Sequence, residues 1–416
     1  KLRKGVKFHN GEPFNAAAVK FTVERYLEKG KPRYSIVAAG FQSAEVVDEY
    51  TVRITTPKPD GVFLERLFEM PIVPPRYLRQ VGEEAFLKKP VGTGSHRWVE
   101  WVKGSHFTLE ANPDYWRGAP QVRRATWKLI TEIATRVSAL KAGEVDIALQ
   151  LPPDMIGEIS AHPKLRVSAA NSPRIIYFIF YPQSTLRSGG PIEDRRVRQA
   201  LNHAVNVDNI IKFVMNNQAV RVATLYSPLT AGHDPSIRPF DYDPARARKL
   251  LAEAMYPNGF TIDIDVPAGG NPIKPAEVGQ AVVADFAKIG VQAKLRVLDT
   301  ATYAQMKFQY KLAPLLMWNW MAWDGDYILY WNAHTKSPWF HYAGHNAEID
   351  RLLDEQRVII DPAKRNEIFK KLQQRMKEDA PHLPLYQQKD VFGVNRRVEW
   401  EGVPGGYLFV RNIRVK

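Results

Sequence analysis

The stretch that decides the fold reads Leu315-Leu-Met-Trp-Asn-Trp-Met-Ala-Trp-Asp-Gly-Asp-Tyr-Ile-Leu-Tyr-Trp331, and four of the ten tryptophans lie in it. Its two-residue alternation predicts a strand with Leu316, Trp318 and Trp320 on one face. The strand breaks at residues 323–326, where a glycine between two aspartates predicts a turn that presents carboxylates. An apolar strand, aromatic rings and an acidic turn together predict a ligand pocket, although tryptophans on a strand also serve simply as core.

Length and composition define the class of protein around this stretch. The chain of 416 residues is too long for a single hydrophobic core, so we expect two or three compact units. It contains 45% hydrophobic and 25% charged residues, as soluble globular proteins do, and no run of the roughly 20 apolar residues that span a bilayer. The absence of cysteine excludes disulfides, thiolate metal sites and a cysteine nucleophile, and it fits an oxidising compartment.

The formal net charge of +14 raises the question of an anionic partner. Acidic residues are interleaved with basic ones, and the densest basic run, residues 195–198, directly follows Glu193 and Asp194. This pattern favours a solvated basic surface over a dedicated nucleic-acid groove. We therefore expect no nucleic-acid partner, while anionic ligands or a negative membrane surface stay open.

Helix and strand signals alternate through the second half of the chain. Residues 278–289 have helical spacing and end before Gly290, and the alternating segments 262–266 and 291–297 predict strands. Near the start, Asn15 is the expected N-cap of a helix over residues 16–26. The alternation indicates an open α/β domain, in which ligands bind beyond the carboxyl ends of the strands. The end of the strand at residue 320 is such a place.

A series of segments along the chain has a recognisable order: Leu2–Phe14 with Ala18-Val19, Val91–Gly94, Glu110–Trp116, Ala139–Ala148, Arg196–Val205, Tyr242–Leu251 and Tyr256–Phe260. In this order they resemble segments of the family 5 extracellular solute-binding proteins, the oligopeptide, dipeptide and nickel receptors of ABC importers. The resemblance extends from the first residues to about Pro384. One departure is the glycine turn at residues 91–94, which is followed by Ser95 and His96 where the family has proline and tyrosine.

The resemblance implies an α/β, two-lobed periplasmic-binding-protein fold of type II, cluster C, with a hinge between the lobes. Implied boundaries are residues 1–90 for a small subdomain of the first lobe, 91–176 for its main part, 177–390 for the second lobe and 391–416 for the return to the first. The two chain crossings are expected at residues 175–181 and after Pro384. Two crossings permit closure around a ligand.

The same resemblance implies a receptor that captures a small solute, a short peptide or related amine-bearing compound, and delivers it to a membrane ABC permease. An opine, a sugar conjugate or a metal chelate is the alternative ligand. The implied receptor is monomeric, needs no cofactor, and is periplasmic or membrane-tethered outside the cell. Because the chain opens on a strand-like run, residues 1–8, we expect further residues before Lys1.

Eight residues are the candidate ligand contacts. In peptide-binding relatives an aspartate of the strand-end loop receives the free amino group of the peptide, but here Trp323 stands at that position. Either Asp324 takes over from one residue away or the ligand lacks the ammonium. Tyr177 is a ligand contact or a core residue, and Asn271 a ligand contact or a turn residue. The candidates are Trp318, Trp320, Trp323, Asp324, Asp326, Tyr327, Tyr177 and Asn271.

No catalytic motif is present. The sequence lacks a Gly-x-Ser-x-Gly elbow, a phosphate-binding glycine loop and a His-Glu-x-x-His pair. A hydrolase using Asp324 and Asp326 is the rival from another class, although no matched acid and base accompany them. His334, His341 and His345 have spacings of seven and four, but Pro338 and Gly344 interrupt the segment, so we expect no metal site.

Overall fold

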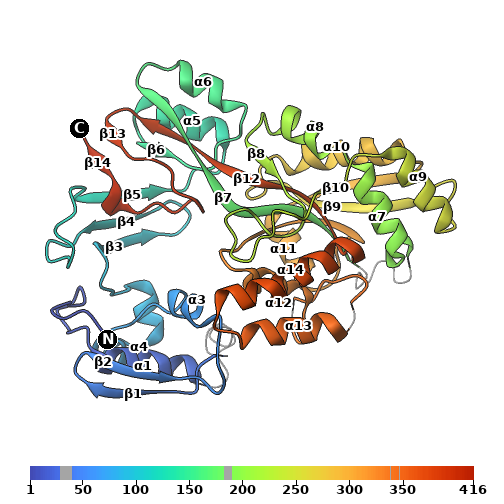
Figure 1. Ribbon diagram of the computed structural model, residues 1–416. Helices are drawn as coiled ribbons and strands as arrows, with labels where there is room; N and C mark the ends of the chain where they lie inside the picture. Colours follow the sequence, from blue (N-terminus) through green and yellow to red (C-terminus); the bar gives the residue numbers. More distant parts are fainter. Residues whose placement is uncertain (29–39, 182–189, 338, 346) are drawn as a thin grey trace.

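The structure is a computed structural model that describes residues 1–28, 40–181, 190–337, 339–345 and 347–416. Figure 1 shows two smaller units and a larger one, and one long pair of strands runs between the larger unit and one of the smaller units. Among the helices that the structure describes, none combines the length and the apolar character needed to traverse a bilayer.

The N-terminal residues form a small unit around one hairpin. Helix α1 begins after Asn15, whose side chain accepts a hydrogen bond from the Ala18 backbone N–H, so the expected N-cap is confirmed. Val19, Val23 and Tyr26 of this helix pack with Phe41 in a core of their own. The elements are α1 (Ala16–Leu27), β1 (Ser43–Asp48), β2 (Thr51–Thr55), α3 (Phe63–Phe68) and α4 (Pro75–Lys88).

A second unit contains a three-stranded antiparallel sheet and two helices. The sheet order is β3-β4-β5, and the C-terminal strands β13 and β14 return to this part of the molecule (Figure 1). The elements are β3 (His96–Val102), β4 (His106–Ala111), β5 (Arg124–Lys128), α5 (Ile133–Ala142), β6 (Ile147–Ala148), α6 (Met155–Ala161), β13 (Val398–Glu399), η3 (Val410–Asn412) and β14 (Arg414–Val415).

The largest sheet has seven strands in the order β10-β9-β11-β7-β12-β6, with β8 paired to β12. Strands β10, β9 and β11 are parallel to one another, whereas β7 runs antiparallel to both β11 and β12. The predicted strand at residue 315 is therefore internal to a mixed sheet. The strands are β7 (Leu165–Phe180), β8 (Ala219–Arg221), β9 (Thr261–Pro267), β10 (Gln292–Leu298), β11 (Leu315–Met321) and β12 (His382–Asn395).

Residues 175–181 form the centre of this sheet and are buried on both faces. Ile176, Phe178 and Phe180 belong to one core, while Ile175 and Tyr177 alternate into the other. Alternation of this kind follows from the two-residue period of a strand. It explains why the sequence reads here as a continuous apolar run.

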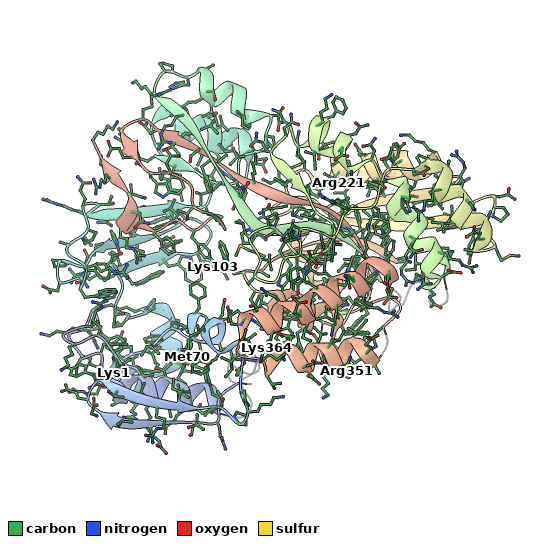
Figure 2. All side chains as sticks on the ribbon, in the orientation of Figure 1. Lys1, Met70, Lys103, Arg221, Arg351 and Lys364 are labelled. Atoms are coloured by element: carbon green, nitrogen blue, oxygen red, sulfur yellow. The ribbon has the colours of Figure 1, made fainter. Side chains whose placement is uncertain are left out.

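Each face of the sheet is covered by its own helices, and side chains fill the space between them (Figure 2). The predicted helix at residues 278–289 is α10, which starts three residues earlier and ends before Gly290, a residue with φ of 82°. One face carries η1 (Pro191–Glu193), α7 (Arg195–Ala204), α8 (Val207–Asn209), η2 (Ile210–Val214), α9 (Pro244–Glu253) and α10 (Pro275–Ala287). The other carries α11 (Thr300–Phe308), α12 (Gly325–Ala333), α13 (Ala347–Arg357) and α14 (Pro362–Asp379).

Strands β7 and β12 connect the larger unit to the rest of the molecule (Figure 1). Residues 165–171 of β7 pair with 389–395 of β12, beside the core that Leu140 and Ile159 form with Val391. The other halves of both strands belong to the same seven-stranded sheet and lie between the two larger cores. The lobe boundaries expected at residues 176/177 and 390/391 therefore fall inside two continuous strands.

Candidate functional site

A cavity of about 650 Å³ opens where three separate segments of the chain meet. The first is α3 and its preceding loop, the second is the end of β11 and the residues after it, and the third is the C-terminal segment 403–409. Arg357, the last residue of α13, also lines the cavity. Its lining residues are Val62, Leu64, Glu65, Arg66, Phe68, Glu69, Met321, Ala322, Trp323, Asp324, Asp326, Tyr327, Trp331, Arg357, Val403, Pro404, Tyr407 and Phe409. The volume lies in the range of small-molecule sites.

Helix α3 presents an apolar face to the cavity. Leu64 is 74% exposed and Phe68 is 70% exposed, which is unusual for two apolar side chains one helical turn apart. Asp60 fixes the start of the helix, because it accepts hydrogen bonds from the Val62 backbone N–H at 3.0 Å and from Arg66 Nε at 2.9 Å. The exposed pair therefore stands on a helix that is held in place.

The segment after β11 forms the second wall. The Ala231 backbone N–H donates to the Trp323 carbonyl at 2.7 Å, and Thr230 Oγ1 donates to the Ala322 carbonyl at 2.9 Å. These bonds hold residues 322–323 against the loop at residue 230, while the Trp323 indole stays 39% exposed on the cavity side. The indole is thus presented by a backbone that has little freedom to move.

Gly325 is the first residue of α12, and a larger residue at this position would clash with Tyr226. A Cβ atom at this position would lie 2.2 Å from the Tyr226 hydroxyl oxygen. Asp324 is the N-cap and accepts a hydrogen bond from the Asp326 backbone N–H at 2.8 Å. The expected turn is therefore a helix start, with glycine required by its close approach to Tyr226.

The C-terminal segment forms the third wall. The Tyr407 and Phe409 rings stack with centroids 5.7 Å apart, and both line the cavity. Gly405 and Gly406 precede them with φ of 87° and 69°, a conformation that favours glycine. A Cβ on Gly405 would lie 3.1 Å from the Trp323 ring, so glycine lets this segment pack closely against the indole.

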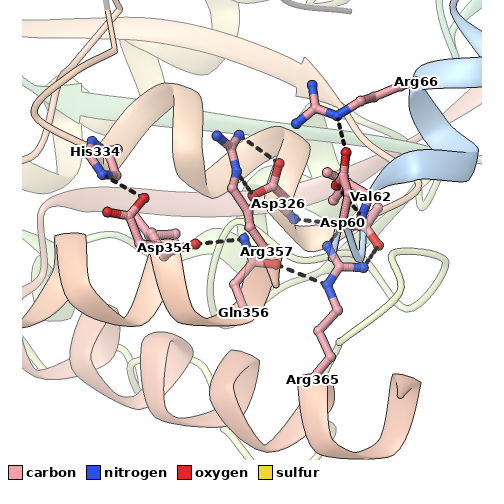
Figure 3. A network of polar contacts seen from close by, with 11 residues as sticks. Asp60, Val62, Arg66, Asp326, His334, Asp354, Gln356, Arg357 and Arg365 are labelled. Carbon is pink, nitrogen blue, oxygen red and sulfur yellow. Dashed lines mark hydrogen bonds and ion pairs between the residues drawn. The ribbon is translucent and has the colours of Figure 1, made fainter. Parts of the chain in front are cut away.

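The two aspartates of the strand-end loop are each paired with an arginine. Arg365 donates to both oxygens of Asp324, at 2.6 and 2.7 Å. Arg357 donates to both oxygens of Asp326, at 2.7 and 2.9 Å, and Gln356 joins the two pairs by hydrogen bonds to Asp326 and Arg365, as Figure 3 shows. Two-pronged pairs of this kind are the strong form of an ion pair. Both carboxylate charges are therefore balanced inside the protein.

The remaining acids of the lining come from the α3 region. Glu65 and Glu69 line the cavity, and burial raises the pKa of Glu65, with the Asp324 charge adding to the effect. Burial also raises the pKa of Asp324, which the Arg365 guanidinium opposes. Asp324 and Asp326 are each paired with an arginine, whereas, among the residues that the structure describes, Glu65 and Glu69 are not. The α3 side of the cavity, which carries these two glutamates, is therefore the negative side.

Four of the eight predicted contacts line the cavity, namely Trp323, Asp324, Asp326 and Tyr327. Trp318 and Trp320 do not. The Trp318 ring stacks on Tyr303 and lies below the Lys307 ammonium, 4.2 Å from its ring centre. Trp320 packs against Tyr327 and Trp339. Both indoles extend from the face of β11 that belongs to a core, as the alternation of the strand requires.

Tyr177 and Asn271 are also outside the cavity lining. Tyr177 is fully buried, its hydroxyl donates to Asn332 Oδ1 at 3.4 Å, and burial raises its pKa. In the structure, Tyr177 is therefore a core residue and does not contact the cavity. Asn271 lies at a cis peptide bond with Pro272, where its carbonyl accepts from Asn319 and its side chain accepts from Gln388. Asn271 joins strands rather than lining the cavity.

The three histidines of the interrupted segment have other neighbours. His341 Nε2 lies 3.1 Å from Lys307 Nζ, whereas His334 and His345 approach Asp350. Over the described ranges of the chain, no group of three or more histidine, cysteine, aspartate or glutamate residues is arranged to hold a metal ion. Pro338, one of the two interruptions, lies outside the described residues.

Sequence reasoning missed two of the three walls. It attached no role to α3, whose Leu64 and Phe68 are exposed. It also missed Trp331, Arg357 and the segment 403–409. The signals available were apolar residues on the outward face of a short helix and a Gly-Gly pair beside two aromatic residues. Neither signal indicates that the two segments meet in space.

Comparison with sequence families gives a match over most of the chain. The model of the bacterial extracellular solute-binding proteins, family 5 middle region, matches residues 1–339. A glutathione-binding protein of Pectobacterium atrosepticum is 30% identical over 96% of this chain and 78% of the relative. Heme-binding protein A of Haemophilus influenzae is 28% identical over 92% of this chain and 75% of the relative.

Solved structures give the same result for the fold. The ABC transporter-associated periplasmic binding protein DppA of Helicobacter pylori, solved with the peptide STSA, superimposes with a TM-score of 0.83 at 26% identity. The superposition covers 100% of this chain and 85% of that structure.

Proposed function

This chain belongs to the family 5 bacterial extracellular solute-binding proteins, the substrate-binding components of ABC importers, and we propose that it binds a short peptide or related amine-bearing solute in the cavity described above. The resemblance read from the sequence is thereby confirmed, and with it the two-lobed type II binding-protein fold. The identity of the solute and the residues that hold it belong to the proposal.

The proposal rests mainly on the fact that distant parts of the sequence form the walls of the cavity. Residues 62–69, 321–331 and 403–409 are far apart in the sequence, and each supplies at least one apolar or aromatic side chain to the cavity. A site made by separate parts of a chain forms fully only when those parts approach one another, which is how a hinged receptor encloses a solute. Trp323, Tyr407 and Phe68 would then exclude water from the bound ligand.

Charge supports an amine or another hydrogen-bond donor on the ligand. Asp324 and Asp326 are balanced by Arg365 and Arg357, so their role in this proposal is to hold the loop rather than to receive an ammonium. Glu65 and Glu69 leave the α3 side of the cavity negative. A carboxylate of the ligand placed on the α3 side would meet these glutamates at an energetic cost, so we expect the ligand to turn its anionic groups away from α3.

The test is a binding titration followed by tryptophan fluorescence and by calorimetry, with reduced glutathione, the peptide STSA and heme as probes. We expect at least one peptide-like probe to bind and to change the fluorescence. Trp323→Ala should weaken that binding about tenfold or more, because a large aromatic contact is lost.

Trp101→Ala is the matched control, since Trp101 is 60% exposed on β3 and does not line the cavity. It should leave the affinity unchanged. Failure of every probe, or equal binding by wild type and Trp323→Ala, would refute the proposed site. Preference for heme over the peptides would favour the alternative ligand class of chelates, opines and sugar conjugates, whose flat faces also stack on indoles.

We further propose a monomeric receptor without catalytic turnover, located in the periplasm or tethered outside the cell, with lobes divided near residues 176 and 390. The relatives are solute-binding proteins rather than enzymes. A hydrolase would need Asp324 or Asp326 as a free acid or base, and each is engaged by an arginine.

Release of product from peptides or glycosides at a catalytic rate, with that activity lost in Asp324→Asn, would overturn the proposal that the receptor has no catalytic turnover. Retention on duplex DNA that falls steeply with salt would overturn the absence of a nucleic-acid partner.

A further inference from the structure

The pairing of β7 with β12 has two register shifts, and the second lies between Gln387 and Lys389. Gln387 pairs with Ile175 and Lys389 pairs with Asn171, so three residues of β7, Ser172 to Arg174, lie opposite Gln388 alone. A bulge of this kind turns side chains away from the regular alternation of a strand. Arg174 belongs to this bulge, and on the other side of β7 it pairs with Met321 at the end of β11.

The Arg174 guanidinium is positioned but incompletely bonded. Its Nη1 donates to Asn319 Oδ1, and the Asn319 amide nitrogen is in turn fixed by donating to the Asn271 carbonyl at 2.9 Å. Its Nη2 lies 4.0 Å from the Met321 sulfur. Its Nε is buried and has no hydrogen-bond partner among the described residues. A donor left open on a group that is otherwise held in place is available to a ligand.

Asp390 of β12 carries a negative charge near the positively charged Arg174, and one of its carboxylate oxygens can still accept a hydrogen bond. Asp390 is 6% exposed, and its buried Oδ2 has no hydrogen-bond partner in the part of the chain that the structure describes. Burial raises the pKa of Asp390, and the Arg174 charge and the nearby Ser172 hydroxyl oppose that shift. Among the described residues, Asp390 forms no ion pair, although Arg174 is near enough to act on it. Opposite charges that stay apart in a buried place leave room for a polar group between them.

This pair adjoins the cavity through residues that line it. Met321 and Tyr407 are both lining residues, and both lie near the Arg174 guanidinium. Gly406 passes Asp390 so closely that a Cβ there would lie 3.1 Å from Oδ2, while the neighbouring Gly405 packs on Trp323. The charged pair therefore lies next to Met321 and Tyr407 of the cavity lining, and next to the two glycines that precede Tyr407.

We propose that Arg174 and Asp390 bind the zwitterionic head of an amino-acid-like ligand, with the carboxylate accepting from Arg174 and the ammonium donating to Asp390. The open positions are one donor and one acceptor of opposite charge, so a lone anion would leave Asp390 unsatisfied and a lone cation would leave Arg174 unsatisfied. The rest of the ligand would then extend past Tyr407 towards Trp323. The inference rests on the proposed function, because it requires the ligand to occupy the cavity.

The experiment compares reduced glutathione, whose γ-glutamyl residue carries such a head, with N-acetyl-glutathione, in which the ammonium is blocked. Calorimetry on the wild-type chain should give glutathione binding at least about tenfold tighter than binding of the acetylated form. Arg174→Gln and Asp390→Asn should each weaken glutathione about tenfold or more. Asp390→Asn should also remove the preference over the acetylated form.

Lys389→Gln is the control, since Lys389 neighbours Asp390 on β12 and its side chain points to the opposite face of the strand. It should bind glutathione as the wild type does, and thermal melts of all three variants should match the wild type. Equal glutathione binding by Arg174→Gln, Asp390→Asn and wild type would overturn this inference and leave the proposed function standing. Binding of STSA or heme without glutathione would overturn it too, and no binding of any probe would overturn both.

Discussion

The Arg365 guanidinium and the Asp324 carboxylate form a two-pronged ion pair with N–O distances of 2.6 and 2.7 Å, and both side chains are buried. Arg365 belongs to α14 and Asp324 caps α12, so the pair ties the loop that carries Trp323 to the helical layer. The acid next to the tryptophan is thus engaged by the protein itself.

Removal of Arg365 should expose the cost of a buried, unpaired carboxylate. We expect Arg365→Met to lower the free energy of unfolding by about 3–5 kcal/mol, the usual result of removing one partner of a buried pair. Urea denaturation at pH 7 measures the difference. Lys364→Met, on the exposed neighbour in the same helix turn, should change the value by less than about 0.5 kcal/mol. Equal values for both variants would contradict the structural role assigned to the pair.

A second prediction concerns the contact between the N-terminal unit and α13. The Gly61 backbone N–H donates to the Arg357 carbonyl at 2.6 Å, and a Cβ on Gly61 would lie 2.3 Å from the Ile359 carbonyl oxygen. Gly61→Ala should therefore push α3 away from α13 and open the cavity. We expect ligand affinity to fall by about 1–3 kcal/mol, the range for inserting a methyl group into a packed contact.

Small-angle scattering on Gly61→Ala with the bound probe should show a larger radius of gyration than the wild type. Gly92→Ala serves as the control, because nothing lies within 4 Å of a Cβ at Gly92. If Gly61→Ala kept wild-type affinity and dimensions, the contact at Arg357 would not contribute to closure.

The fold could be predicted from the sequence because its signals are local. Alternation over residues 315–321, the Asn15 cap and the break at Gly290 each depend on a few adjacent residues, and each element is present in the structure. The continuous apolar run at 175–181 also has a local cause, since it is buried on both faces. Family resemblance then supplied the order of the elements, which local signals do not determine.

The site was predicted only in part because its walls come from separate segments. The sequence identified Trp323 from its own stretch, but it contained no sign that Phe68 and Phe409 would lie near it. The charges of the two aspartates after β11 also led to a wrong expectation, again because their partners are distant in the sequence. Asp324 and Asp326 read as ligand acids, and only the structure brings Arg365 and Arg357, more than 30 residues later in the chain, to neutralise them.

The last prediction concerns Lys307, which is buried beneath the aromatic face of β11. The side chain is 2% exposed, its Nζ lies 3.1 Å from His341 Nε2 and 4.2 Å from the centre of the Trp318 ring, and burial lowers its pKa to about 7. In the unfolded chain a lysine titrates near pH 10.4, so between pH 7 and about 10 the unfolded state binds more protons than the folded state. The free energy of unfolding should therefore rise with pH across this interval.

Lys307→Met removes that contribution, and the comparison of two pH values isolates it. From pH 7 to pH 9 we expect the wild type to gain up to about 2–3 kcal/mol relative to Lys307→Met in urea denaturation. The neighbouring groups do not titrate in this window, since the pKa of His341 is lowered well below its usual value by burial and that of Tyr181 is raised by burial. Lys311→Met, an exposed lysine three residues past α11, should show the wild-type pH dependence. Parallel stability curves for wild type and Lys307→Met would mean that Lys307 stays protonated in the fold, and that the Trp318 ring and His341 compensate for its burial.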